Sequence, residues 1–172
     1  MLMLYRTGRT IAFLSALAIL VVIFIITIFI IADNNDDLSQ NEGIQVQLIG
    51  AGGGIIEDNS NVRFDTIFND QSSDIDYDSA TGEFTIHAPG NYYISWSLAV
   101  DGAGPMTYIN YTVTVNGNPY ASASSPIVSG ELSGTALVTV KTVPTIISLV
   151  NTTGFETFVP LTPVQGNLVI LK

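Results

Sequence analysis

The chain has no cysteine and only one histidine among its 172 residues. The lack of cysteine excludes disulfides, thiolate nucleophiles and thiolate metal sites. A lone histidine, His87, cannot form the metal sites that need several histidines. The sequence contains no Gly-x-Ser-x-Gly motif, so it offers no typical nucleophilic serine that His87 could activate as a general base. We therefore expect no enzymatic activity, and His87 to be an outward residue of a strand.

Basic residues are also scarce. Five Lys and Arg oppose 15 Asp and Glu. All 15 acidic residues follow residue 32, where only Arg63, Lys141 and Lys172 oppose them, so residues 33–172 carry a formal net charge of −12. Such a surface repels nucleic acid and anionic lipid headgroups. We expect neutral glycans, other proteins, cations or further copies of the chain as partners.

One long apolar run stands near the N-terminus. Residues 11–32 contain no charged residue and, as a helix of 22 residues, span roughly 33 Å, enough for a bilayer core. Arg6 and Arg9 precede the run and acidic residues follow it, which predicts residues 1–10 inside the cell and the rest outside. Representative positions of this single-pass membrane anchor are Ile11, Leu20, Phe24 and Ile31.

A cleaved signal peptide is the alternative for this run. Its apolar region is normally about 7–15 residues long and ends in a small-x-small site. The run here is longer, and Ile30 stands where cleavage after Ala32 would require a small residue. A retained signal anchor is therefore the preferred interpretation, and both alternatives export the remainder.

Residues 33–43 form an acidic linker without heptads or Gly-x-y triplets, so no coiled-coil or collagen stalk is expected. Residues 44–172 read as one all-β domain, because short runs of β-branched and aromatic residues alternate with Gly, Pro and Asn-Gly turn signals. The predicted strands are 44–49, 62–68, 83–87, 91–100, 107–115, 119–123, 134–142, 145–151 and 166–171. Turns are predicted at Thr81-Gly82, Pro89-Gly90 and Asn116-Gly117.

The alternation of residue types predicts which faces are buried. Residues 109–115 place apolar and polar residues in turn, so this strand should bury one face. Residues 168–171 and 146–150 are apolar on both faces, and in a two-sheet sandwich the second face needs another subunit or element to cover it. The sequence thus predicts an oligomer, with Tyr93, Val169 and Leu171 as possible interface residues.

Residues 77–95 read YDSATGEFTIHAPGNYYIS. This stretch resembles the signature of the globular heads of complement component 1q. The resemblance implies a ten-stranded jelly-roll sandwich, shared with tumour necrosis factor (TNF), that assembles as a tight homotrimer. The residues expected to build its core and turns are Phe64, Tyr77, Thr81, Gly82, Phe84, Pro89, Gly90, Tyr92, Trp96, Gly166 and Leu168.

One turn differs from the turn usual in the animal complement 1q heads, and this difference narrows the resemblance to a subgroup. Lys141-Thr142-Val143-Pro144 occupies the place of a usual Gly-Asp turn. With its neighbours it looks more like the C-terminal domain of BclA-type glycoproteins of the spore surface (exosporium), which carry the domain on a collagen-like stalk that this sequence lacks. The resemblance implies a non-enzymatic structural or adhesion module of the cell or spore surface. The alternatives are a glycan-binding, lectin-like domain and a receptor-engaging, TNF-like ligand.

Other candidate sites are weaker. Asp74, Asp76 and Asp78 are weak calcium candidates, but Ser79 and Thr85 stand where an EF-hand needs Gly and Glu. No other cofactor is expected.

The glycines of residues 50–54 do not match a nucleotide-binding fingerprint and read as a flexible connection. Asn110 and Asn151 begin glycosylation sequons whose use depends on the host, and the side chain of Asn110 is expected to point outward.

Overall fold

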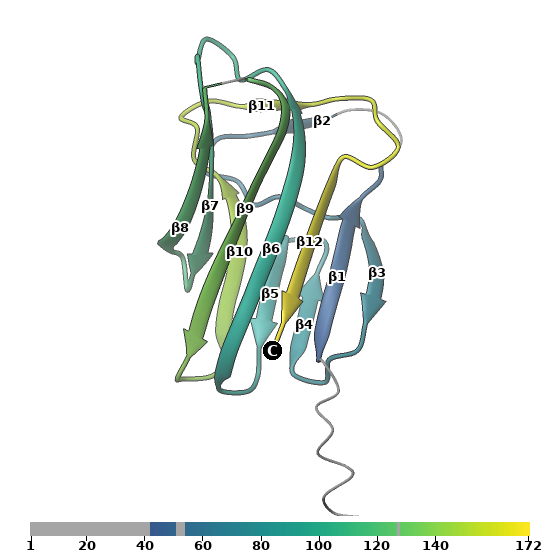
Figure 1. Cartoon of the computed structure of the whole chain (residues 1–172), viewed down its shortest axis with the longest axis vertical. Coiled ribbons are helices and arrows are strands. Elements are labelled where there is room, and N and C mark those ends of the chain that lie inside the picture. The colour runs from purple at the N-terminus through teal and green to yellow at the C-terminus, as the bar shows by residue number, and fades with distance from the viewer. Residues whose placement is uncertain (1–41, 51–53, 127) are drawn as a thin grey trace, which may run out of the picture. The chain divides into compact units, whose positions relative to one another are not determined.

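Two five-stranded antiparallel sheets pack face to face in a β-sandwich (Figure 1). The computed structural model describes residues 42–50, 54–126 and 128–172. The predicted anchor and most of the predicted linker lie outside these ranges. Within them, no helix has the length and apolar character needed to cross a bilayer.

The first sheet, called the β6 sheet after its longest central strand, has the order β3-β1-β12-β6-β9. Its strands are β3 (Thr66–Asp70), β1 (Gly43–Leu48), β12 (Gly166–Leu171), β6 (Gly90–Asp101) and β9 (Ser129–Val140). The domain thus begins one residue earlier than predicted, since Gly43 pairs with Leu171.

The second sheet, called the β7 sheet, has the order β4-β5-β10-β7-β8. Its strands are β4 (Ile75–Asp78), β5 (Glu83–Ile86), β10 (Thr145–Asn151), β7 (Ile109–Val115) and β8 (Asn118–Ser125). A separate ribbon of two strands, β2 (Gly54–Ile56) and β11 (Thr157–Val159), crosses the end of the sandwich opposite to the start of β1 and the end of β12 (Figure 1).

The core lies between the two sheets, because alternate residues of each strand point inward. On β6 the inward row is buried as predicted, with Tyr92, Ile94, Trp96, Leu98 and Val100 all at most 3% exposed. Across the sandwich, the rings of Trp96 and Tyr111 lie 6.1 Å apart. This core is contained within the described residues from Gly43 onward, so the segment has what an independently folding domain needs.

The prediction of a strand over residues 62–68 is wrong in its first half, since β3 begins at Thr66. Val62 and Phe64 are fully buried, which explains the strand-like alternation. The backbone, however, crosses between the sheets here. The N–H of Val62 donates to the carbonyl of Leu149 on β10, and that of Asp65 donates to the carbonyl of Gln47 on β1.

The prediction that residues 109–115 bury only one face is also wrong. Thr112 and Thr114, on the polar face of β7, are 2% and 8% exposed. Their neighbours cover them, since the hydroxyl of Thr112 lies 2.8 Å from those of both Ser122 and Thr152. Threonine is favoured in β-strands, and its hydroxyl can be buried when it is hydrogen-bonded. The polarity of Thr112 and Thr114 therefore did not predict their exposure.

Candidate functional site

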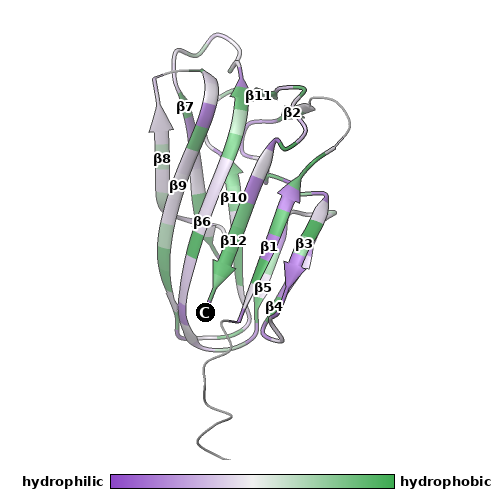
Figure 2. Cartoon of the chain, turned by 45° about the vertical axis from the view of Figure 1, so that its right-hand side comes forward, coloured by the Kyte–Doolittle hydropathy of each residue, from purple (hydrophilic) through white to green (hydrophobic). Residues whose placement is uncertain are grey.

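The outer face of the β6 sheet carries a continuous group of apolar side chains. Leu171, Tyr93 and Leu137 are consecutive cross-strand partners on β12, β6 and β9, and their side chains share one face. They are 39%, 44% and 64% exposed. Val169, half-buried, lies two residues along β12 on the same face. We call these four residues the apolar strip; Figure 2 shows the hydrophobic end of β12 to which two of them belong.

The immediate surroundings of the apolar strip are uncharged, and the two acidic residues of this face, Asp101 and Glu131, lie toward the other end of β6 and β9. Residues 42–172 hold twelve acidic and only three basic side chains. The outward residues around the apolar strip are nevertheless polar or small: Gln45, Gln47, Asn167, Ser95, Ser97 and Thr135. The amide of Gln45 donates to Oδ1 of Asn167 at 2.7 Å. An apolar centre surrounded by uncharged polar residues is the composition of a subunit interface.

The structure brings together the three residues predicted for an interface, Tyr93, Val169 and Leu171. It adds Leu137, which the sequence interpretation missed. The sequence could have indicated Leu137. Ala136, Val138 and Val140 form the buried row of β9, and Leu137 alternates with them, so its large apolar side chain must point outward.

The motif residues build the fold. Five of them form part of the core and are at most 3% exposed: Phe64, Phe84, Tyr92, Trp96 and Leu168. The ring of Tyr77 lies 4.5 Å from that of Phe84, and its hydroxyl donates to the carbonyl of Phe64 at 2.9 Å. Burial raises the pKa of Tyr77 to about 12, so it stays a neutral donor that ties β4 to the crossing segment.

The motif glycines fit places where a side chain would collide. Gly82 has φ of 75°, and a Cβ there would lie 2.6 Å from the carbonyl oxygen of Val62. The carbonyl of the preceding Thr81 accepts a hydrogen bond from the amide of Asn61. Gly166 packs against Leu98 at the start of β12. Pro89 is exposed and Gly90 begins β6, so this predicted turn is the passage between the two sheets.

The three acidic calcium candidates have separate partners. Asp74 accepts a hydrogen bond from Nζ of Lys172 at 2.5 Å, and Asp76 lies 2.8 Å from Nε2 of His87, which is exposed as predicted. Asp78 accepts from the backbone N–H of Ala80. Among the described residues, no three His, Asp or Glu side chains are grouped to hold a metal ion. Calcium binding stays a prediction, which the melting temperature in millimolar calcium tests.

The two sequons differ in their surroundings. Asn151 is fully buried, and its amide donates to the carbonyls of Ile56 and Phe155, both at 2.9 Å. A glycan on this nitrogen is incompatible with the fold. Asn110 lies on the outer face of β7, in alternation with the buried Ile109 and Tyr111, but it is half-buried, and its amide donates to the hydroxyl of Thr152 at 2.6 Å.

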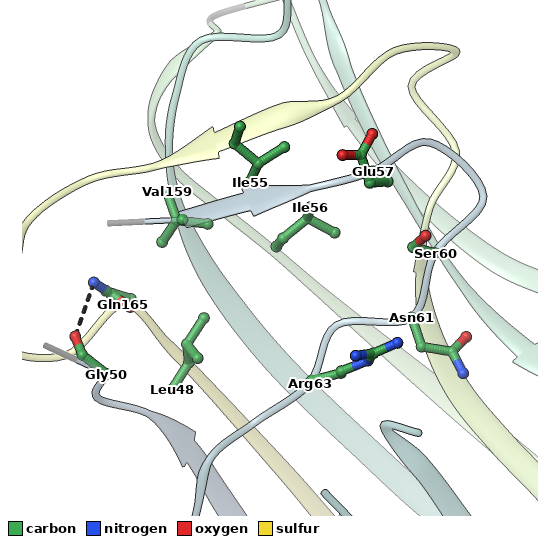
Figure 3. A pocket seen from close by; sticks show the side chains of 11 residues that line it. Leu48, Gly50, Ile55, Ile56, Glu57, Ser60, Asn61, Arg63, Val159 and Gln165 are labelled. Atoms are coloured by element: carbon green, nitrogen blue, oxygen red, sulfur yellow. Dashed lines mark hydrogen bonds between the residues drawn. The ribbon is translucent and has the colours of Figure 1, made fainter. Parts of the chain in front are cut away.

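A pocket of about 390 Å³ lies between the β2–β11 ribbon and the adjacent ends of β1 and β12 (Figure 3). The sequence interpretation did not find it, because its walls come from segments far apart in the chain. It is lined by Leu48, Gly50, Gly54, Ile55, Ile56, Glu57, Ser60, Asn61, Arg63, Val159 and Gln165.

The family model of the C1q domain matches residues 54–142, just over half of the chain. The chain belongs to the C1q domain family. No curated protein matches it. The two five-stranded sheets are the ten-stranded jelly roll that the motif predicted, to which the β2–β11 ribbon adds two strands.

Solved structures with the C1q and TNF jelly roll resemble the chain. The Eiger TNF of S. frugiperda is 11% identical, with 77% of this chain and 92% of that chain covered and a TM-score of 0.61. The globular domain of zebrafish complement 1qA is 18% identical, with coverages of 77% and 95% and a TM-score of 0.55. Murine APRIL is 10% identical, with coverages of 77% and 99% and a TM-score of 0.57. These likenesses establish the shared fold.

Proposed function

We propose that this C1q-type domain forms a homotrimer through the apolar strip. We further propose that the protein is a non-enzymatic structural or adhesion module, displayed outside the cell on a single-pass N-terminal anchor. The observation that carries the trimer is the apolar strip, which is surrounded by uncharged residues although the domain as a whole is acidic. The family resemblance supplies the number of subunits.

Association through this face is energetically reasonable. Tyr93, Leu137 and Leu171 leave large apolar side chains in water in the single chain. Covering a large aliphatic or aromatic side chain contributes about 1.5–3 kcal/mol when it is removed completely from water. The surrounding amides and hydroxyls can exchange water for partners across the interface without the cost of burying charge.

A charge placed in the apolar strip tests the proposed interface. In residues 40–172, Leu137→Glu should convert the trimer to monomers at micromolar concentration, because three carboxylates would be buried near one another. Leu137 is 64% exposed in the single chain, so the domain itself should stay folded by circular dichroism. Sedimentation velocity gives the mass.

Ile146→Glu is the matched control, because Ile146 is also an exposed apolar residue but lies on β10 of the β7 sheet. This variant should remain trimeric. The proposed interface is wrong if Leu137→Glu keeps the mass of the wild-type domain, or if Ile146→Glu dissociates equally.

The anchor and the cell-surface location rest on the apolar run at residues 11–32 and its flanking charges. The full chain should remain in the membrane fraction after alkaline carbonate extraction, and external protease should remove the C-terminal domain from intact cells. Release into the medium with a new N-terminus near residue 33 would instead establish signal cleavage.

The likeness to BclA-type domains suggests a spore surface as the narrower setting, which antibody labelling of spores and vegetative cells tests.

A further inference from the structure

Arg63 is an unpaired cation in an acidic domain. Within the described residues, its side chain makes no ion pair or hydrogen bond, although twelve carboxylates are available in residues 42–172. Lys172, by contrast, contacts the carboxylates of both Asp74 and Glu42. Arg63 lines the pocket beneath the β2–β11 ribbon (Figure 3). An anionic group entering the pocket would therefore find a guanidinium that no described carboxylate occupies.

Gln165 offers a fixed hydrogen-bond acceptor in the same pocket. Its side chain is 4% exposed, and Nε2 donates to the carbonyls of Pro160 at 3.0 Å and Gly50 at 3.3 Å. Because both neighbours accept, the amide nitrogen must face them and its orientation is determined. Oε1 accepts no hydrogen bond among the described residues.

The pocket also has an apolar part. Leu48, Ile56 and Val159 line it, and the last two are 9% and 6% exposed. In the view of Figure 3, Gln165 and Arg63 are drawn on either side of Leu48 and Ile56. A volume of about 390 Å³ falls at the small end of known ligand sites, which suits a compact molecule.

The carboxylate of Glu57 limits the charge of the ligand. Glu57 lines the pocket and forms no ion pair among the described residues. It would repel a second negative charge, so the pocket should prefer a monoanion to a dicarboxylate.

We propose that this pocket binds a small N-acylated amino acid with an apolar side chain. The carboxylate pairs with Arg63, the amide N–H donates to Oε1 of Gln165, and the side chain packs on Leu48, Ile56 and Val159. The two polar groups of the ligand thus meet pocket groups that have no partner among the described residues. The proposal does not depend on the oligomeric state.

Nuclear magnetic resonance titration of ¹⁵N-labelled residues 40–172 with N-acetyl-L-leucine tests this directly. Saturable shifts should concentrate on the amides of Leu48, Ile56 and Gln165. The neutral N-acetyl-L-leucinamide should bind at least about tenfold more weakly, since it lacks the carboxylate, and N-acetylglycine should also bind more weakly because it lacks the apolar group.

Arg63→Gln should weaken N-acetyl-L-leucine binding about tenfold and preserve the spectrum elsewhere, because this side chain supports no described contact. Lys141→Gln is the matched control, since it removes an exposed cation that does not line the pocket. Its affinity should stay within about twofold of the wild type. Shifts that do not saturate, equal binding of the amide, or equal losses in the two variants would overturn the proposal.

Discussion

At the scale of single residues, one close packing contact in the β6 sheet joins Trp96 and Gly134. The two are cross-strand partners on β6 and β9, and the ring of Trp96, 3% exposed, covers the glycine. A Cβ at position 134 would lie 2.7 Å from Cζ2 and 2.9 Å from Cε2 of the ring. The absence of a side chain at Gly134 is therefore what allows the ring of Trp96 to come this close to β9.

Gly134→Ala should destabilise the domain by about 1–3 kcal/mol, because a rigid indole cannot move aside without disturbing the core. Chemical denaturation followed by Trp96 fluorescence measures this loss. Gly54→Ala is the control, since a Cβ there meets nothing within 4 Å. It should be neutral or slightly stabilising, by less than about 1 kcal/mol. Equal effects of the two substitutions would show that the Trp96 contact has no special importance.

The second residue-scale prediction concerns Asn151. Its amide nitrogen donates hydrogen bonds to the carbonyls of Ile56 and Phe155, and its Oδ1 accepts one from the N–H of Thr153 at 3.0 Å. Asn151→Ala should cost about 2 kcal/mol or more, because these buried groups lose their partner. Thermal or urea unfolding measures the change.

Asn69→Ala provides the comparison for this prediction, since Asn69 is exposed on β3 and has no side-chain hydrogen bond among the described residues. It should change the free energy of unfolding by no more than about 0.5 kcal/mol. A loss at Asn151 as small as that at Asn69 would contradict the structural role assigned to the buried amide.

These residues also show what sequence can and cannot predict at this scale. The turn at Asn116-Gly117 was predictable, because both residues tolerate the positive φ values of 51° and 74° that they adopt. The role of Asn151 was not, because the carbonyl of Ile56 lies 95 positions away. The sequon suggested a modified surface residue, whereas long-range hydrogen bonds make the residue part of the interior.

At the scale of elements, composition and length together decided which strands were predictable. The strands β6, β7 and β10 carry enough β-branched and aromatic residues to be identified from their composition. The short strands β2, β4 and β11 were missed. They have three, four and three residues, and each is defined by a partner distant in sequence or by an adjoining strand rather than by its own composition.

Two ion pairs of Lys172 connect the ends of three strands. Lys172 follows β12, and its Nζ contacts Asp74 before β4 at 2.5 Å and Glu42 before β1 at 3.6 Å. The hydrogen bond from Lys172 lowers the pKa of Asp74, and the same bond raises the pKa of Lys172. Both shifts favour the charged forms in the folded state.

The stabilisation from this pair should consequently depend on pH. For Asp74 the contribution is present above the ordinary carboxyl pKa of 3.8 and is lost as the pH falls through its lowered value. For Lys172 it is present below 10.5 and is lost as the pH rises through its raised value. Lys172→Gln should therefore lower the melting temperature at neutral pH but not at strongly acidic pH.

Melting curves of the wild type, Lys172→Gln and Lys141→Gln between acidic and neutral pH check this. Lys141 is exposed and belongs to none of the described ion pairs, so its substitution should have little effect at any pH. High salt should reduce the Lys172 effect, because the paired side chains are about one-third exposed or less. A difference for Lys172→Gln that stays constant at strongly acidic pH would rule out the ion pair as its cause.

At the scale of the whole molecule, the fold was more predictable than the binding sites. The turn and aromatic positions of residues 77–95 were sufficient to indicate the jelly roll, and the C1q family match and the two five-stranded sheets confirm it. The apolar strip was predicted in part, from strands apolar on both faces. The pocket at Arg63 was not, because no single segment contains its walls.

The central claim is that the domain is a trimer built on the outer face of the β6 sheet. Sedimentation equilibrium of residues 40–172 at micromolar concentration tests it most directly. We predict a single species with three times the mass of one chain, unchanged on dilution through that range. A species with the mass of one chain would contradict the account.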